Sequence, residues 1–450
     1  MFSRQIVFAI LVILTTGCSG LPFQTHSPTL EATAAVSPPV TPTLGPIITP
    51  SPPGEVTPSG SMTLTLWLPL QFDPDSGTRA GELLKARLEE FSLRRPGVRL
   101  DVRLKTMDGT GGLLDSLTAA SAAAPLALPD VIALPRPLME TAALKGLLLP
   151  LDGLTQALDD PEWYDYAWEL SRLQDTTFGL PFAGDALLLV YHPATLEVPP
   201  RTWDEVLLLE NPLLFPAADP QALTSLAFYR SAGGPVQDEQ GRPLLDADIL
   251  GQMLTFYQSG ELNQVFPYWL SQYETFEQSW TGYLENPQGT TVAWLSRYLS
   301  AEAALLDGSD LTTEEGMAAQ DQIAAAPLPS PTGDPFTLAN GWVLSLAGSQ
   351  PSKHALAVEL AEFLTETEYL ASWSEASGLL PPGSNVLAGW EDVLTRDLVR
   401  QVANSAHIPP STDILSSLAP LLQQATLQIL KQQGEPFSLA ESAAAHLENP

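Results

Sequence analysis

Residues 178–192 read FGLPFAGDALLLVYH, and the rest of the chain can be divided around this stretch. Glycine and proline mark a tight turn at its start, and the apolar run that follows them is typical of a buried strand. We therefore interpret residues 178–192 as the crossing of the chain from a first lobe into a second.

The chain before this crossing alternates strands with helices. The predicted order is strand 63–68, helix 79–93, strand 98–104, helix 112–124, strand 130–134 and helix 138–144. Such an order with short connections predicts right-handed crossovers and a parallel sheet, and ligands of such sheets lie beyond the carboxyl ends of the strands. This rule places Trp67, Asp108 and Arg136 beside one crevice.

The chain after the crossing is rich in helices. Residues Thr202 to Glu205 form a capping-box pattern that predicts a helix start, and residues 220–325 are mainly helical. Four prolines then interrupt the chain at 327–335. The predicted elements that follow are a strand at 336–346, a helix at 352–365, and further helices at 391–403 and 412–432.

Composition excludes several classes of protein. The 450 residues are 44% hydrophobic and 16% charged, which indicates a globular protein with a large core. The 20 Lys and Arg stand against 52 Asp and Glu, and a net charge of -32 argues against a nucleic-acid partner and against electrostatic docking to anionic lipid. One cysteine and five scattered histidines predict no disulfide, no metal site and no cofactor.

The first 60 residues are predicted to direct and tether the protein. Residues 1–18 have the order of a secretory signal and end in Thr15-Thr16-Gly17-Cys18, which resembles a bacterial lipobox with Cys18 as the lipidated residue. Thr15 stands where a leucine is preferred. Residues 19–60 follow as a disordered tether, because between Leu21 and Gly60 there are 10 Pro and 11 Ser and Thr.

An ordered set of short motifs resembles the family 1 extracellular solute-binding proteins, the maltose-binding-like receptors of ATP-driven (ABC) importers. The resemblance covers about 62–447. It rests on Thr65-Leu66-Trp67, Arg94-Arg95-Pro96-Gly97-Val98, Pro129-Asp130-Val131, Gly179-Leu180-Pro181-Phe182, Thr202-Trp203-Asp204-Glu205, Ala326-Pro327-Leu328-Pro329, Asn340-Gly341-Trp342, Ala361-Glu362-Phe363-Leu364 and His407-Ile408-Pro409.

This resemblance implies a two-lobed α/β fold of the type II periplasmic-binding-protein kind. Each lobe would hold a mainly parallel sheet flanked by helices, with the ligand in the hinge cleft. The implied first lobe is 61–184 with 328–368, and the implied second lobe is 185–327 with 369–450. Ligand that contacts both lobes would lower the free energy of the closed state relative to the open one.

A sugar ligand would need aromatic planes for the C–H faces of its rings and polar side chains for its hydroxyl groups. The candidate ligand-binding residues are Trp67, Asp108, Phe182, Asp185, Trp280, Trp294, Asn340 and Trp342. Core packing is the alternative for the tryptophans, and a turn-forming role is the alternative for Asp185. Ile414-Leu415 replaces the stacking tryptophan of maltose-type receptors, so linear maltodextrins are not the expected ligand.

These observations predict a monomeric, lipid-anchored extracytoplasmic receptor that delivers a sugar or oligosaccharide to the permease subunits of an ABC importer. Two alternatives remain open from the sequence. A secreted glycosidase would need two carboxylates about 5 to 10 Å apart across a cleft, and no catalytic motif is present, so we predict that the protein is not an enzyme. A surface lipoprotein that binds an envelope polymer or a protein would have the same fold.

Overall fold

The computed structural model describes residues 62–159, 161–286, 288–306 and 322–448. The predicted signal segment, Cys18 and the predicted tether at 19–60 lie outside the described residues. Within the described part of the chain, no helix combines the length and the apolar character that crossing a membrane requires.

The first strands and helices form a parallel sheet unit, as predicted. β1 pairs with β2 and with β3, in parallel in both cases. The elements are β1 (Met62–Pro69), α1 (Arg79–Arg94), β2 (Val98–Lys105), α2 (Leu113–Ala123), β3 (Val131–Pro135) and α3 (Arg136–Leu144). The carboxyl ends of β1, β2 and β3 therefore meet at one edge, which is where an open α/β sheet binds its ligands.

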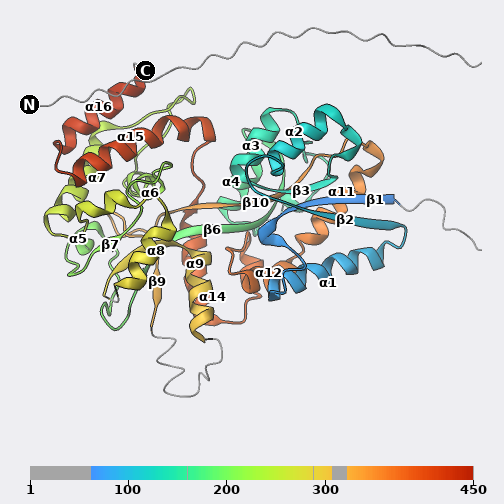
Figure 1. Cartoon of the computed structure of the whole chain (residues 1–450), viewed down its shortest axis with the longest axis horizontal. Coiled ribbons are helices and arrows are strands. Elements are labelled where there is room, and N and C mark those ends of the chain that lie inside the picture. The colour runs from blue at the N-terminus through green and yellow to red at the C-terminus, as the bar shows by residue number, and fades with distance from the viewer. Residues whose placement is uncertain (1–61, 160, 287, 307–321, 449–450) are drawn as a thin grey trace, which may run out of the picture. The chain divides into compact units, whose positions relative to one another are not determined.

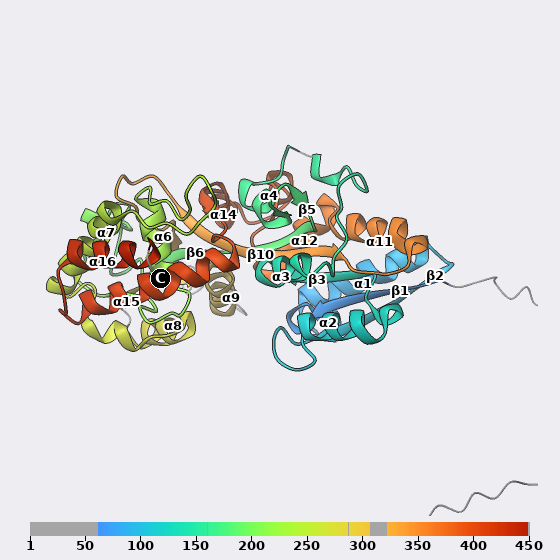
Figure 2. The same cartoon turned by 90° about the horizontal axis from the view of Figure 1, so that it is seen from above.

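Two long strands, β6 (Leu180–Tyr191) and β10 (Thr337–Leu346), join this unit to the remainder of the sheet. β10 is antiparallel to β3 and to β6, and the second half of β6 pairs with β8 (Thr290–Trp294). The resulting strand order is β2-β1-β3-β10-β6-β8-β7. β6 and β10 lie between two groups of helices in both views of the molecule (Figures 1 and 2).

The remaining strands and helices lie around the two halves of this sheet. The short strands are β4 (Arg172–Leu173), β5 (Thr176–Thr177), β7 (Leu213–Leu214), β9 (Ala324–Ala326) and β11 (Ala406–His407). The helices are α4 (Asp165–Ser171), α5 (Trp203–Val206), α6 (Leu223–Ser231), α7 (Ala247–Leu262), α8 (Phe276–Glu285), α9 (Leu295–Leu306), α11 (Pro351–Leu364), α12 (Thr367–Ser377), α13 (Ser384–Leu387), α14 (Val393–Ser405), α15 (Thr412–Leu430) and α16 (Pro436–Glu448).

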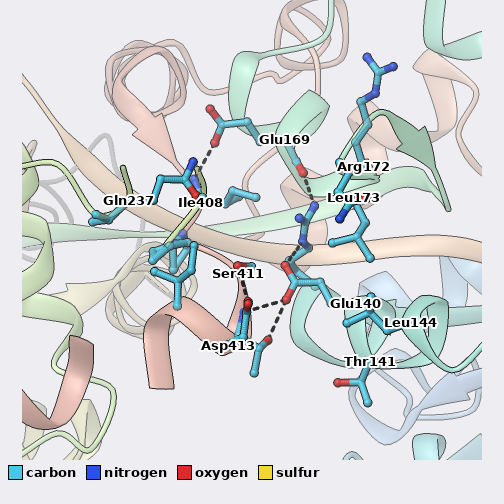
Figure 3. A pocket seen from close by; sticks show the side chains of 18 of the residues that line it. Glu140, Thr141, Leu144, Glu169, Arg172, Leu173, Gln237, Ile408, Ser411 and Asp413 are labelled. Atoms are coloured by element: carbon cyan, nitrogen blue, oxygen red, sulfur yellow. Dashed lines mark hydrogen bonds and ion pairs between the residues drawn. The ribbon is translucent and has the colours of Figure 1, made fainter. Parts of the chain in front are cut away.

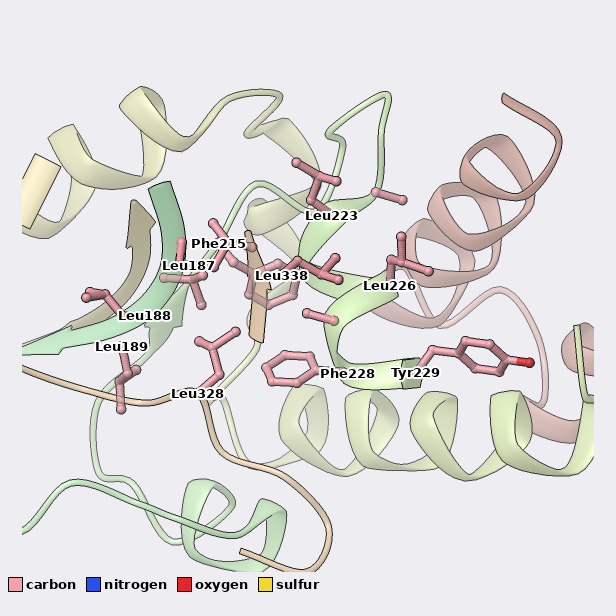
Figure 4. Packing of buried hydrophobic residues seen from close by; sticks show 14 of the residues in the cluster. Leu187, Leu188, Leu189, Phe215, Leu223, Leu226, Phe228, Tyr229, Leu328 and Leu338 are labelled. Carbon is pink, nitrogen blue, oxygen red and sulfur yellow. The ribbon is translucent and has the colours of Figure 1, made fainter. Parts of the chain in front are cut away.

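Within the described residues, buried apolar side chains form three clusters. The largest surrounds the second half of β6, where Leu187 and Leu189 pack with Phe215 and Phe228 (Figure 4). The other two clusters lie against the sheet of β1 and β3, one holding Leu64 and Leu66 and the other holding Trp67 and Ile132. Because successive residues of a strand point to opposite faces, this alternation covers both faces of the first sheet unit.

The helix α12 corrects one detail of the predicted division into lobes. The sequence assigns residues from 369 onward to the second lobe, but Leu370 and Trp373 pack in the cluster that holds Leu64 and Phe91. Trp373 reaches Phe182 at a ring-centroid distance of 4.3 Å. α12 therefore belongs with the first lobe, and the division of the remaining residues stays a prediction.

Close packing against β6 requires a glycine at one position. A Cβ atom on Gly184 would lie 2.6 Å from the ring of Tyr166, which is fully buried. The Tyr166 hydroxyl donates to the carbonyl oxygen of Pro381 at 2.8 Å, so the ring cannot move away without losing that bond. The absence of a side chain at Gly184 therefore lets α4 lie directly on the crossing strand.

We expect Gly184→Ala to lower the free energy of unfolding by about 1 to 3 kcal/mol, because it overpacks this contact. Urea unfolding of the variant measures the loss. Gly97→Ala is the matched control, since a Cβ atom there meets nothing within 4 Å. Equal stability of the two variants would contradict the packing argument.

Candidate ligand-binding site

The two faces of the β6 and β10 pair carry different side chains. Asp185 pairs with Asn340, and Ala183 pairs with Trp342, so Asp185, Asn340 and Trp342 share one face. The intervening Gly184 and Gly341 point to the opposite face, against Tyr166 and Leu170 of α4. The polar and aromatic face is therefore the one available for a ligand, and the glycine face is filled by a helix.

Asp185 lies at the centre of the ligand-facing side. Its Oδ1 accepts the backbone N–H groups of Ala186 and Ser296, each at 3.0 Å, and its Oδ2 accepts the Ser296 hydroxyl at 2.5 Å. Ser296 lies in α9, beyond β8, so this carboxylate connects the crossing strand to the second lobe. Burial raises the pKa of Asp185 to about 6, although these hydrogen bonds oppose the shift.

The first wall of the site comes from the segment after β1 and from β10. It encloses a cavity of about 570 Å³ that includes Phe72, Asp73, Asp185, Ser296 and Trp342 in its lining. Phe72 meets the half-buried Trp342 edge to face, with ring centroids 5.4 Å apart. The carboxyl end of β1 thus supplies both an aromatic ring and a carboxylate, as expected for a parallel strand end.

The second wall comes from the carboxyl ends of β7 and β8. It encloses a cavity of about 410 Å³ whose lining includes Asp219, Phe276, Trp294, Ser296 and Arg297. The half-buried Trp294 meets Phe276 with ring centroids 5.4 Å apart. Ser296 lines both cavities, so the two walls meet at the Asp185–Ser296 hydrogen bonds. The site therefore combines aromatic rings with carboxylates on both of its sides.

A family profile described as bacterial extracellular solute-binding protein matches residues 75–371. This chain belongs to that family. Solute-binding proteins bind a solute and do not transform it, so the prediction that the protein is not an enzyme is confirmed. No curated protein matches the chain.

Solved structures show the same fold as this solute-binding protein. The cyclic alpha-maltosyl-1,6-maltose binding protein of Arthrobacter globiformis superposes with a TM-score of 0.69 at 18% identity, over 87% of this chain and 100% of that one. The GacH receptor of Streptomyces glaucescens gives 0.61 at 16% over 86% and 99%, and maltose-bound MalE3 of T. maritima gives 0.60 at 20% over 86% and 99%. The predicted two-lobed type II α/β fold is confirmed. The prediction of a mainly parallel sheet in each lobe is wrong for the second lobe, because β8 and β9 both pair antiparallel with the long crossing strand β6, although β7 and β8 are parallel.

Three of the predicted ligand-binding residues of this solute-binding protein lie together. Asp185 and Trp342 line the first cavity, and Trp294 lines the second. Asn340 shares the face of Asp185, but its side-chain oxygen accepts the N–H of Gly341 and it lines neither cavity. Asp108 is exposed in the loop after β2 and also lies outside both.

Three other predicted residues are buried and present no face to a ligand. Trp67, Phe182 and Trp280 have 3%, 1% and 1% of their surfaces exposed. β1 continues for two residues beyond Trp67, so its ring packs on the sheet face among Leu113 and Leu117 instead of lying at the strand end. The assignment of these three rings to ligand stacking is therefore wrong, and they act in the core.

The sequence reasoning missed several residues of the site. Phe72, Asp219, Phe276 and Arg297 line the cavities without having been singled out. Asp219 is buried because its carboxylate accepts the N–H groups of Gln221 and Leu223 at the start of α6, and burial raises its pKa. A sequence signal did exist for Phe276, because a capping box at Thr275 begins α8 there.

No group of three or more His, Cys, Asp or Glu side chains could hold a metal ion in the part of the chain that the structure describes. The site offers hydrogen-bonding oxygens, one guanidinium group and aromatic rings. Such a set suits a neutral, hydroxyl-rich solute better than it suits a metal or a cofactor.

The raised pKa of Asp185 predicts a pH-dependent stability. A carboxyl group with a folded-state pKa near 6, above the ordinary 3.8, favours the protonated form, so its contribution is complete below about pH 4 and is lost as the pH rises through 6. As the pH rises from 4 to 7.5, we expect the free energy of unfolding of Asp185→Asn to increase by on the order of 3 kcal/mol relative to that of the unchanged protein.

Urea unfolding at both pH values measures this gain, with the exposed Asp108→Asn as the control. The asparagine can still accept the Ser296 N–H, so the geometry of the site is retained. If the two proteins differ in stability by the same amount at both pH values, burial does not raise the pKa of Asp185.

Proposed function

We propose that this solute-binding protein is a lipid-anchored extracytoplasmic receptor that captures a sugar or oligosaccharide between its lobes and delivers it to an ABC importer. The observation that carries this proposal is the pair of half-buried tryptophans, Trp342 and Trp294, on the two walls that meet at Asp185. A pyranose ring that fills such a site stacks its C–H face on indole and bonds its hydroxyls to carboxylates.

The solutes of similar structures agree with this proposal. The titles of those structures name maltose, acarbose, alpha-D-tagatose and a cyclic maltosyl-maltose as ligands of the respective proteins. All of these compounds carry many hydroxyl groups. A carbohydrate therefore fits both the chemistry of the residues here and the ligand class of proteins with this fold.

The structure also bears on the expectation that linear maltodextrins are not the solute. Ile414 stands where maltose-type receptors are implied to place a stacking tryptophan, and here it is buried at the start of α15. It therefore offers no aromatic plane to a second glucose unit. We propose a solute held by Trp294 and Trp342 beside Asp185.

We also propose that Cys18 carries the lipid, that residues 19–60 tether the folded part to the outer face of the membrane, and that the receptor acts as a monomer. The motif before Cys18 supports the anchor, and the family description supports an extracellular place of action. We expect the full chain made in a bacterial host to incorporate labelled palmitate. Cys18→Ser should lose the label and release the protein from the membrane fraction, and continued labelling of that variant would contradict the assignment.

The sugar proposal is tested by thermal unfolding of the protein with a panel of monosaccharides, disaccharides and cyclic or linear oligosaccharides. A ligand present at 100 times its dissociation constant contributes about 2.7 kcal/mol to stability, so a binding sugar raises the unfolding midpoint. We expect Trp294→Ala to raise the dissociation constant of that sugar by about 10- to 100-fold, because it removes one stacking plane.

Phe437→Ala is the control for Trp294→Ala, because Phe437 is a half-exposed ring on α16 outside both cavities. It should bind the sugar normally. No shift with any member of the panel, or an unchanged affinity in Trp294→Ala, would contradict the proposed function. Released product in the same mixtures would contradict the conclusion that the protein is not an enzyme.

A further inference from the structure

The two cavities of the proposed sugar site hold several negative charges and a single positive one. The charged residues in the lining of the first cavity, of about 570 Å³, are Asp73 and Asp185. The charged residues in the lining of the second cavity, of about 410 Å³, are Asp219, Glu274, Glu277 and Arg297. Carboxylates therefore line both walls, and Asp185 lies where the two walls meet.

The positive charge of Arg297 is largely balanced by the protein itself. Its guanidinium group donates to Glu277 at 3.2 Å. The same group lies over the ring of Trp280, 4.9 Å from the ring centroid, and Trp280 is buried in the largest apolar cluster. Arg297 therefore offsets the charge of Glu277 and leaves the other carboxylates of the site without a counter-charge.

Those other carboxylates form no ion pair with any residue that the structure describes. Asp185 and Asp219 are both more than 90% buried. The hydrogen bonds that they accept come from backbone N–H groups and from the Ser296 hydroxyl, which carry no net charge. Burial raises the pKa of both carboxyls, as expected where no cation lies beside them. The site therefore presents uncompensated negative charge in poorly hydrated surroundings.

A groove elsewhere in the protein differs in this respect. It has a volume of about 1020 Å³ and lies beside Glu140, where α3, α4 and the segment 408–414 come together (Figure 3). Arg136 in its lining pairs with Glu140. Arg172 and Arg230 also line it, and neither forms an ion pair with any residue in the described ranges. The negative charge of the whole chain therefore does not by itself explain why the sugar site has no free cation.

We propose that this receptor selects uncharged sugars and rejects acidic ones, such as uronic acids and sugar phosphates, because the unpaired carboxylates of both cavities repel a negative group on the solute. The inference rests on the proposed function, in which one sugar contacts Trp342 and Trp294. The rings and the family support binding at this place, and the carboxylates add only the sign of the charge that is excluded. A sugar that spans both cavities passes Asp185, so an acidic group at any position on it comes near a carboxylate.

The same side chains provide affinity for hydroxyl groups and selection against acids. A sugar hydroxyl can donate a hydrogen bond to each of these carboxylates. An ionised acid has no such proton to donate, and it brings a further negative charge into surroundings where like charges repel more strongly than in bulk water. The site therefore discriminates by repelling the wrong solute as well as by binding the right one.

The test compares sugars that differ at one carbon. Glucose is compared with glucuronate and glucuronamide, galactose with galacturonate and galacturonamide, and disaccharides that carry these rings at one end are compared in the same way. The amide has nearly the shape of the acid and no charge. Acid and amide each compete with the tightest-binding uncharged sugar for the full chain in calorimetric titrations, so only binding at the sugar site is counted. We expect the acid to bind at least about 30-fold more weakly than the amide.

Two variants measure the part of individual carboxylates. Asp219→Asn and Glu274→Gln keep the size of the side chain and remove its charge, and Glu274 is exposed, so its replacement does not disturb the core. Each should reduce the ratio between acid and amide by about fivefold. Asp108→Asn is the control, since Asp108 is exposed and lines neither cavity. A rise in NaCl from about 20 mM to about 500 mM should also reduce the ratio in the unchanged protein, because salt screens the repulsion.

A measurement without any sugar keeps the inference testable if no member of the panel binds. Iodide and caesium quench indole fluorescence by collision, and the difference between the protein and Trp294→Phe isolates the quenching of Trp294. We expect caesium to quench Trp294 more strongly than iodide at equal ionic strength, and Glu274→Gln to narrow that gap. Trp163→Phe gives the same comparison for a half-buried ring outside both cavities, and Glu274→Gln should leave that ring unchanged.

The outcomes separate this inference from the proposed function. A weakly competing acid, a tolerated amide and a smaller ratio in Asp219→Asn and Glu274→Gln support selection by charge. An acid that competes as well as its amide, an equal effect of Asp108→Asn, or iodide that quenches Trp294 as strongly as caesium overturns it. If no sugar of any charge binds but caesium quenches Trp294 more strongly, the charge assignment stands and the sugar-receptor function fails.

Discussion

The antiparallel pairing of β6 with β10 is the constraint on which the rest of the structure depends. The pair runs in register from Ala339 opposite Ala186 to Trp342 opposite Ala183, and a bulge follows at Trp342. Because side chains alternate along both strands, one face holds Asp185 and Trp342 while the other holds only glycine and alanine. The same few residues therefore fix where a ligand can lie and where α4 must pack.

The burial of Asp185 costs folding free energy, and hydrogen bonds from neighbouring residues offset part of that cost. Asp185 is buried, which disfavours its charged form, and three hydrogen bonds from Ala186 and Ser296 compensate in part. Those bonds also connect the crossing strand to α9. A carboxylate that is held so firmly can accept hydroxyl groups of a solute without reorganising, which lowers the cost of binding.

Much of the fold could be predicted from the sequence because its signals are local. The alternation in 98–104, the Pro-Gly stop after α1 and the capping box at Thr202 are set by neighbouring residues, and the structure confirms the elements they predict. The residues that line the ligand site were harder to predict. The sequence places both Trp67 and Trp294 near strand ends, yet the Trp67 ring packs on the sheet and the Trp294 ring lines a cavity, because their surroundings come from distant segments such as α2 and α8.

We propose that one sugar bridges both walls of the cleft. A crystal structure of the protein with the sugar that most raises its unfolding midpoint tests this bridging. We expect sugar rings in van der Waals contact with the indoles of both Trp342 and Trp294, and a hydroxyl within hydrogen-bonding distance of Asp185. A sugar lodged in the groove beside Glu140, or resting on one wall alone, would contradict it.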